Sequence, residues 1–146
     1  MSRAFVKDDD ERPDSQIERV LQTEPHNVTP RGMQLLRDAL AECEREERMP
    51  DVRYYQAKID TAIVVDAKGE SKDTVGFGAS VRVKDNAGNT MVLVIVGEEE
   101  AAPQDGKISY LTPYAQALDG HHVGERVQVH RPAGPVWLTI EGISYD

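Results

Sequence analysis

Acidic side chains gather at two places in the chain where they could hold a metal ion together with a partner. One group lies within residues 44–51 and the other is the run at residues 98–100. Mg²⁺ prefers oxygen ligands and keeps part of its water shell, so carboxylates at the end of a rigid arm could share such an ion with another macromolecule. Simple solvation of an exposed tip explains the same residues, and spacing alone leaves both readings open. The side chains concerned are Glu44, Glu46, Glu47 and Asp51, and Glu98, Glu99 and Glu100.

Other reactive residue types do not form a catalytic or cofactor pattern. The chain has no phosphate loop, no dinucleotide-binding glycine motif and no zinc-protease motif. No motif links Ser109 to a base and an acid, and spacing places no third ligand beside His121 and His122. His26 is expected to be solvated. We therefore predict a protein that is not an enzyme and that has no cofactor and no metal site of its own.

Composition narrows the classes of partner. The chain has 146 residues, enough for one domain or for one domain with a small appendage, and its formal net charge is −9. A nucleic-acid binder needs a basic face to displace counterions, and the sequence contains no basic stripe, so contact with nucleic acid is expected only through a partner. No apolar run approaches a membrane span, no signal peptide is expected, and the single cysteine, Cys43, excludes an internal disulfide. The cytoplasm is the expected location.

A helical hairpin is predicted to carry the first acidic group. Thr29 and Pro30 form a helix start, since threonine caps a helix and proline fits its first position. Apolar residues then recur at spacings of 3, 4 and 3 on both sides of Pro50, which predicts two antiparallel helices, the first over residues 30–48 and about 28 Å long. The two seams are Met33, Leu36, Leu40 and Cys43, and Val52, Tyr55, Ile59 and Ala62.

The rest of the chain changes to a β pattern. Alternating or continuous apolar segments predict strands over residues 80–84, 91–96, 107–111, 126–131 and 136–143. Thr112 and Pro113 repeat the cap-plus-proline signal and predict one short helix. The predicted fold class is α+β: a short antiparallel helical hairpin followed by an antiparallel sheet with one short helix. The predicted parts are a polar N-terminal arm at 1–27, the hairpin at 28–66 and the sheet domain at 75–146.

Several segments resemble the Gre transcription elongation factors, the GreA/GreB family. Residues 27–40 (NVTPRGMQLLRDAL) resemble the start of the family's coiled coil, and residues 95–101 (IVGEEEA) its I-V-G-E-x-E-A segment. Residues 108–118 (ISYLTPYAQAL) resemble I-S-x-x-S-P-x-A-x-A-L, with Thr112 in place of serine. Residues 120–127 (GHHVGERV) and 140–145 (IEGISY) resemble the segments that close the domain. These motifs occur in the family's order, so together they are specific.

The resemblance implies a fold and a partner. The C-terminal domain would be FKBP-like (FK506-binding-protein-like) and would dock at the rim of the secondary channel of RNA polymerase, while the coiled coil points down the channel. It implies a polymerase-binding surface formed by Ser109, Tyr110, Leu111, Thr112 and Pro113 with Glu98, Glu99 and Glu100. In cleaving members of the family, tip carboxylates help to hold Mg²⁺ in the polymerase active site, and the polymerase performs the chemistry.

This sequence departs from the family at the tip. The family's tip motif is missing, so Glu46, Glu47 and Asp51 are acidic without matching its catalytic positions. The sequence is closer to the short coiled-coil (Rnk-like) variant, and we expect a transcription regulator that does not stimulate transcript cleavage. The alternatives are a cleavage-stimulating factor that supplies tip carboxylates, a general protein-interaction module, and, more remotely, a prolyl isomerase. The sequence leaves the oligomeric state open.

Overall fold

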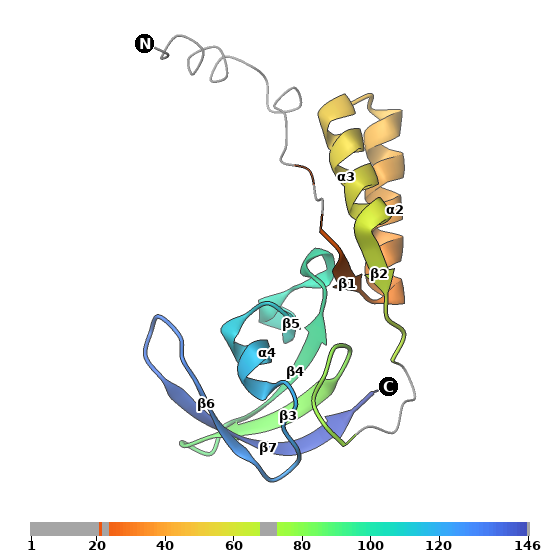
Figure 1. Ribbon diagram of the computed structural model, residues 1–146. Helices are drawn as coiled ribbons and strands as arrows, with labels where there is room; N and C mark the ends of the chain where they lie inside the picture. The colour runs from red at the N-terminus through yellow and green to blue at the C-terminus, as the bar shows by residue number, and fades with distance from the viewer. Residues whose placement is uncertain (1–20, 22–23, 68–72, 146) are drawn as a thin grey trace. The chain divides into compact units, whose positions relative to one another are not determined.

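The computed structural model describes residues 21, 24–67 and 73–145 (Figure 1). Most of the arm predicted at 1–27 therefore lies outside the described residues. Contacts divide the described chain into two compact units. The first contains Met33–Ala62 and the described residues up to His26, and the second contains Asn27–Gly32 and the chain from Ile63 onward.

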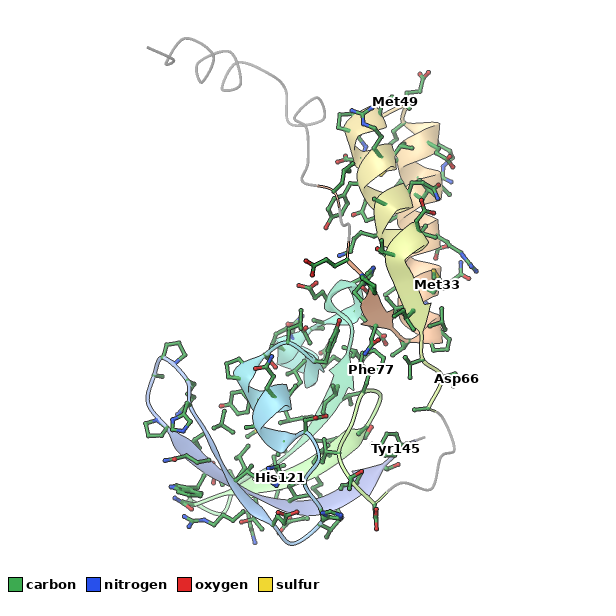
Figure 2. All side chains as sticks on the ribbon, in the orientation of Figure 1. Met33, Met49, Asp66, Phe77, His121 and Tyr145 are labelled. Atoms are coloured by element: carbon green, nitrogen blue, oxygen red, sulfur yellow. The ribbon has the colours of Figure 1, made fainter. Side chains whose placement is uncertain are left out.

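Two helices make the first unit a hairpin. Helix α2 (Pro30–Arg45) and helix α3 (Met49–Thr61) run side by side, with Met33 and Met49 at opposite ends of the hairpin (Figure 2). Of the predicted seam along α2, Met33, Leu36 and Cys43 are buried, as expected, and Leu40 is half-buried. In α3 the predicted apolar residues are only half-buried, and the fully buried positions are Pro50, Asp51 and Lys58.

A recognisable cap ends α2 three residues before the predicted end. The amide of Arg48 donates to the carbonyl of Cys43 at 3.0 Å, and the amide of Glu47 donates to the carbonyl of Glu44 at 3.2 Å. These two bonds form a Schellman motif, which places the residue after the helix in the left-handed region. Here that residue is Glu47, with φ of 55°, where glycine is the usual choice. The tip of the hairpin is therefore a closed turn of defined geometry.

A short two-stranded sheet was not predicted from the sequence. Strand β1 (His26–Val28) pairs with strand β2 (Ala62–Val64). Ala62, predicted in a helix seam, lies in β2, because the helix ends at Thr61. The prediction that His26 is solvated is wrong: the residue is 8% exposed, and Nε2 lies 2.8 Å from the carbonyl oxygen of Lys58.

The second unit contains a five-stranded mixed sheet in the order β5-β4-β3-β7-β6. Every neighbouring pair is antiparallel except β4 and β5, which are parallel. The parallel pair differs from the antiparallel sheet that was expected. The connection at residues 97–106 contains two 3₁₀ turns and brings the chain back toward the end of the sheet where β4 begins, so β5 runs in the same direction as β4. The strands are β3 (Ser80–Asp85), β4 (Thr90–Val96), β5 (Lys107–Ser109), β6 (Arg126–Val129) and β7 (Val136–Ser144), and the turns are η2 (Glu98–Glu100) and η3 (Pro103–Asp105).

The sheet curls around helix α4 (Pro113–Leu118), which lies on its inner face (Figure 1). Side chains alternate along β3, so Val81 and Val83 are buried while Arg82 and Lys84 are exposed. The inner side chains pack with Leu118 of α4 into one hydrophobic core. This arrangement confirms the predicted α+β class and the single short helix of the sheet domain.

Candidate functional site

The predicted docking segment is a tight turn between β5 and α4. Ser109 is buried; its hydroxyl accepts from the amide of Leu111 at 3.2 Å, and its carbonyl accepts from the hydroxyl of Thr112 at 2.8 Å. Thr112 caps α4 by accepting from the amide of Ala115 at 3.3 Å, as the sequence predicts. Leu111, 51% exposed, and Pro113, at the first position of α4, are the members of this segment whose side chains face solvent.

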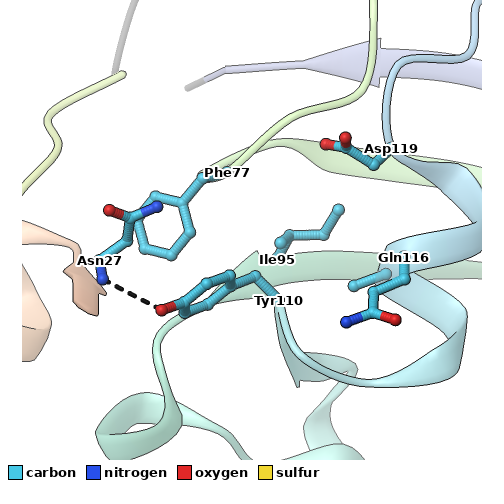
Figure 3. Close-up of a pocket in the computed structure, with 7 residues that line it drawn as sticks. Asn27, Phe77, Ile95, Tyr110, Gln116 and Asp119 are labelled. Atoms are coloured by element: carbon cyan, nitrogen blue, oxygen red, sulfur yellow. Dashed lines mark hydrogen bonds between the residues drawn. The ribbon is translucent and has the colours of Figure 1, made fainter. Parts of the chain in front are cut away.

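A pocket of about 310 Å³ opens beside this turn (Figure 3). Tyr110 forms one wall and meets Phe77 edge-on, with ring centroids 5.3 Å apart. The Tyr110 hydroxyl accepts from the backbone amide of Asn27 at 3.1 Å, which fixes the direction of the ring. The pocket therefore combines apolar walls with a polar rim, a combination suited to an apolar side chain of a partner. Its lining residues are Asn27, Phe77, Ile95, Tyr110, Ala115, Gln116 and Asp119.

The predicted glutamates of η2 differ in what they contact. Glu98 is exposed, whereas both carboxylate oxygens of Glu99 are shielded from solvent. A Cβ atom on Gly32 would lie 2.6 Å from Oε2 of Glu99, and one on Gly97 would also collide with that oxygen. Both glycines therefore leave room for the Glu99 side chain, so this carboxylate is part of the packing of the second unit.

Glu100 is likewise engaged within the fold. Its carboxylate accepts a very short hydrogen bond from the hydroxyl of Thr29. The same hydroxyl accepts from the amide of Gly32 at 2.9 Å and so caps α2, as the sequence predicts. The glutamate of this run that is open to a partner is Glu98.

The hairpin tip brings an arginine to its acidic residues. Nε of Arg48 lies 2.7 Å from Glu46, and Nη1 lies 2.8 Å from Asp51. Asp51 is 8% exposed, although it was predicted as an exposed tip acid. Glu47 is exposed and makes no ion pair with a described residue. Sequence reasoning placed the carboxylates at the tip but missed Arg48, even though its spacing of three from Asp51 suits an ion pair on a helix.

Cys43 lies directly behind this tip. Its side chain is buried, at 2% exposure, and burial raises the pKa of its thiol, while the nearby Arg48 opposes the rise. Cys43 therefore behaves as a small apolar residue of the hairpin seam.

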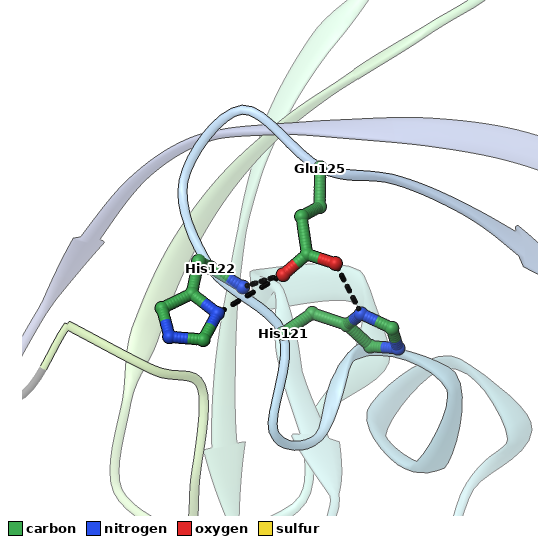
Figure 4. Close-up of polar contacts among 3 residues, drawn as sticks. All are labelled: His121, His122 and Glu125. Atoms are coloured by element: carbon green, nitrogen blue, oxygen red, sulfur yellow. Dashed lines mark hydrogen bonds and ion pairs between the residues drawn. The ribbon is translucent and has the colours of Figure 1, made fainter.

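The two adjacent histidines share one carboxylate (Figure 4). Nδ1 of His121 and Nδ1 of His122 each lie 3.0 Å from an oxygen of Glu125, and the amide of His122 donates to the same carboxylate at 2.6 Å. The hydrogen bond from His121, together with those from His122, lowers the pKa of Glu125 to about 2. The cluster closes the loop after α4.

Residues 21, 24–67 and 73–145 contain no group of three or more histidine, cysteine or acidic side chains placed to hold a metal ion. Within those same residues no helix has the length and apolar character that crossing a bilayer requires.

Comparison with known proteins gives consistent matches. A protein-family model described as "Transcription elongation factor, GreA/GreB, C-term" matches residues 70–145. The transcription elongation factor GreA of Trichlorobacter lovleyi is 40% identical over 96 residues, which are 65% of this chain and 61% of the relative. GreA of Desulfovibrio desulfuricans is 37% identical over 95 residues, or 64% of this chain and 59% of the relative. The match thus spans about three fifths of the length of these relatives.

Among solved structures, the GreA factor homolog 1 (Gfh1) of Thermus thermophilus is similar at 22% identity. The match covers 82% of this chain and 99% of that chain, with a TM-score of 0.45. A prokaryotic elongation factor GreA/GreB from Nitrosomonas europaea matches at 23% identity with the same TM-score.

Proposed function

Because the chain belongs to the GreA/GreB family, we propose that it binds RNA polymerase and regulates transcription elongation without stimulating transcript cleavage. The C-terminal unit docks at the rim of the polymerase secondary channel, and the hairpin enters the channel. The polymerase complex is its only link to nucleic acid, and it acts in the cytoplasm. The family match over residues 70–145, which include the proposed docking segment, supports the choice of partner.

The docking surface is proposed around the turn between β5 and α4. Leu111 and Pro113 are exposed there, and the pocket beside Tyr110 offers an apolar recess of about 310 Å³. Ser109 and Thr112 support this surface by holding the turn, because their hydroxyls are bonded within it. Glu98 adds an exposed carboxylate, whereas Glu99 and Glu100 keep η2 in place.

The hairpin tip supports the second part of the proposal, that the chain does not stimulate transcript cleavage. Arg48 lies against Glu46 and Asp51 with separations of 2.7 and 2.8 Å, so two of the three tip carboxylates already face a cation of their own chain. A carboxylate that shares a Mg²⁺ ion must turn its oxygens toward that ion, and the Arg48 pairs compete with this. Helix α2 has 16 residues, about 24 Å at 1.5 Å per residue, which makes the arm short. The pairing of Arg48 is the single observation that carries this half.

A transcription assay on stalled, backtracked complexes tests the proposal. Purified polymerase complexes with a labelled transcript receive the full chain, and pausing and cleavage are read on the same gel. We expect changed pausing or changed access of a cleavage factor, and no shortening of the transcript. Mg²⁺-dependent shortening that is lost in Glu46→Gln or Glu47→Gln would establish the cleavage-factor alternative instead.

A binding assay with matched variants tests the docking surface. Leu111→Ser removes an aliphatic side chain that is 51% exposed, and Val123→Ser removes one that is 53% exposed elsewhere on the same unit. We expect Leu111→Ser to weaken polymerase binding about tenfold, the effect of about 1.4 kcal/mol, and Val123→Ser to change it little. Equal effects of the two variants would argue against this docking surface. The absence of polymerase binding by the full chain would favour a general interaction module.

A further inference from the structure

The outer face of the C-terminal sheet carries positive charge in an acidic protein. The strand registers place Arg82, Lys84 and Arg126 on this face, because Arg82 pairs with Gly142, and Lys84 and Arg126 both pair with Thr139. All three basic side chains are exposed, and Lys84 has Glu141 within 3.8 Å. The whole chain has a net charge of −9, so this local excess of basic residues is opposite in sign to the rest of the molecule.

The two arginines lie flat on the sheet. The guanidinium of Arg126 stacks on Trp137, 4.3 Å from the ring centroid, and donates to the side chain of Asn86 at 3.2 Å. A Cβ atom on Gly142 would lie 3.2 Å from Nη2 of Arg82, so this guanidinium covers the glycine. Neither arginine makes an ion pair with a carboxylate of the described residues. Their orientation is thus set by the sheet, which lowers the entropy lost when they bind a carboxylate.

Lys84 differs from the arginines in having an acidic neighbour. Its Nζ lies 3.8 Å from Glu141, at the outer limit of an ion pair, and both side chains are partly exposed. Such pairs contribute little and exchange readily with solvent. Lys84 therefore adds positive potential to the face.

A shallow hollow of about 210 Å³ lies beside Arg82. Gly142 lacks a side chain there, and the register of β3 and β7 shifts between Arg82 and Val83, which marks a β-bulge. Val92, 52% exposed, borders the hollow and gives it an apolar wall. The hollow can take an aliphatic side chain next to the guanidinium of Arg82.

The boundaries of this surface are also clear. Val94 and Val96, at the other end of β4, line a separate hollow that is bordered by Asp66 and Glu100. Arg31 lines the same hollow, so this end of β4 carries charges of both signs. The three basic residues of the proposed surface lie on strands β3 and β6, with β7 between them.

An acidic protein segment fits this surface better than a nucleic acid. Single-stranded nucleic acids stack bases on exposed aromatic faces, but Arg126 already covers a face of Trp137. Arginine forks bind carboxylates in a bidentate manner, and the hollow suits an aliphatic residue beside the carboxylate at Arg82.

We propose that the outer face of the sheet binds an extended acidic segment of a partner protein. Arg82 and Arg126 each take a carboxylate, and the hollow over Gly142 takes an aliphatic side chain. Lys84 and Arg126 lie on either side of one strand, about 10 Å apart, and Arg82 is about 7 Å along β3 from Lys84. Side chains two residues apart in an extended segment share one face and lie about 7 Å apart, so a glutamate at Arg82, an aliphatic residue two positions to one side and a second glutamate four positions to the other side match this spacing.

A labelled peptide that repeats Glu-Ser-Leu-Ser, so that glutamate and leucine share one face of an extended segment, tests the proposal on the full chain. Fluorescence anisotropy measures its affinity, and the emission of Trp137, the only tryptophan, reports whether it binds on this face. We expect binding that shifts the Trp137 emission and weakens as salt is raised. A peptide in which glutamine replaces glutamate should bind at least about tenfold more weakly.

Variants with equal charge changes locate the site. We expect the double variant Arg82→Gln with Arg126→Gln to bind the glutamate peptide at least about tenfold more weakly than the native chain does. The double variant Arg37→Gln with Arg45→Gln, which removes two exposed arginines of α2, should stay within about twofold. Gly142→Val fills the hollow and crowds the Arg82 guanidinium without changing charge, and it should also weaken peptide binding.

Three results would overturn the proposal. They are no binding of the glutamate peptide, equal weakening by the two double variants, and tighter binding of an oligothymidylate than of the peptide on the same face. Because no polymerase is present in these measurements, their failure is separate from a failure of the proposed polymerase docking.

Discussion

Two glycines and one glutamate allow a direct test of how the η2 turn is held. Gly32 and Gly97 both lie against the carboxylate of Glu99, whose oxygens are shielded from solvent. The two sites differ in one respect. A Cβ atom on Gly97 would also lie 2.8 Å from the backbone carbonyl oxygen of Asn27, whereas the close contacts of a Cβ atom on Gly32 are all with Glu99. A side chain can be removed by mutation, and a backbone oxygen cannot.

The perturbation is alanine at each glycine, in the native chain and in a Glu99→Ala background. Overpacking of this kind costs about 1–3 kcal/mol, and alanine in a helix gains up to about 1 kcal/mol over glycine. Gly32 lies in α2, so Gly32→Ala should cost about 1 kcal/mol net in the native chain. In the Glu99→Ala background the clash is gone, and Gly32→Ala should become neutral or stabilising. Gly97→Ala should cost about 2 kcal/mol and keep most of that cost in both backgrounds.

Urea unfolding followed by circular dichroism gives the four free-energy differences and the coupling between the sites. At about 2–4 °C per kcal/mol for a chain of this size, thermal unfolding should show the same order. The reasoning is refuted if Gly32→Ala costs the same with and without the Glu99 side chain. Loss of the Gly97→Ala penalty in Glu99→Ala would show that the Asn27 carbonyl can move. If these expectations hold, the Glu99 side chain holds η2, and with it the exposed Glu98 of the candidate docking surface, in place.

Four further measurements address single residues. The pKa of Glu125 is lowered to about 2 from an ordinary value of 4.5, so its contribution to stability is complete above about pH 4.5 and disappears as the pH falls toward 2. Melting temperatures across that range should therefore fall more steeply for the native chain than for Glu125→Gln. Burial raises the pKa of Cys43, so a thiol reagent at about pH 8 should label it slowly in the native protein and rapidly in urea. Thr112→Ala removes the cap of α4 and should cost about 1 kcal/mol, whereas Thr112→Ser should keep most of the stability in the same urea titration. Glu47 has a φ of 55°, so Glu47→Gly should stabilise the hairpin by about 1 kcal/mol, and a gain from Glu47→Ala would contradict the strain argument.

Local chemistry is what the sequence predicts well here. Thr29 and Thr112 cap the helices that they were expected to begin, because a hydroxyl before a proline satisfies amides within three residues. The burial of Leu36 and Cys43 follows from helical spacing alone. In the sheet, alternation identifies the inner residues of β3 in the same way.

Features that depend on distant pairing were not predictable from such signals. Strands β1 and β2 have three residues each and lie more than thirty residues apart in the chain, so neither has a periodic pattern of useful length. The parallel pairing of β5 with β4 depends on the path of the connection between them. The pocket beside Tyr110 draws on Asn27 and Phe77, which no motif joins. Long-range packing thus assembles a site from residues whose types alone are unremarkable.

The two acidic groups show why residue type could not decide function. Glu46 and Asp51 read as available carboxylates, yet Arg48 lies within 2.8 Å of both, and Asp51 is buried. Glu99 and Glu100 read as part of a binding surface, yet one is shielded and the other binds Thr29. Glu44, Glu46 and Glu47 remain exposed at the tip, and Glu98 remains exposed at η2. A metal ion needs several oxygen ligands, and Glu46 and Asp51 already face Arg48, so we propose that the tip occupies a channel rather than delivers an ion.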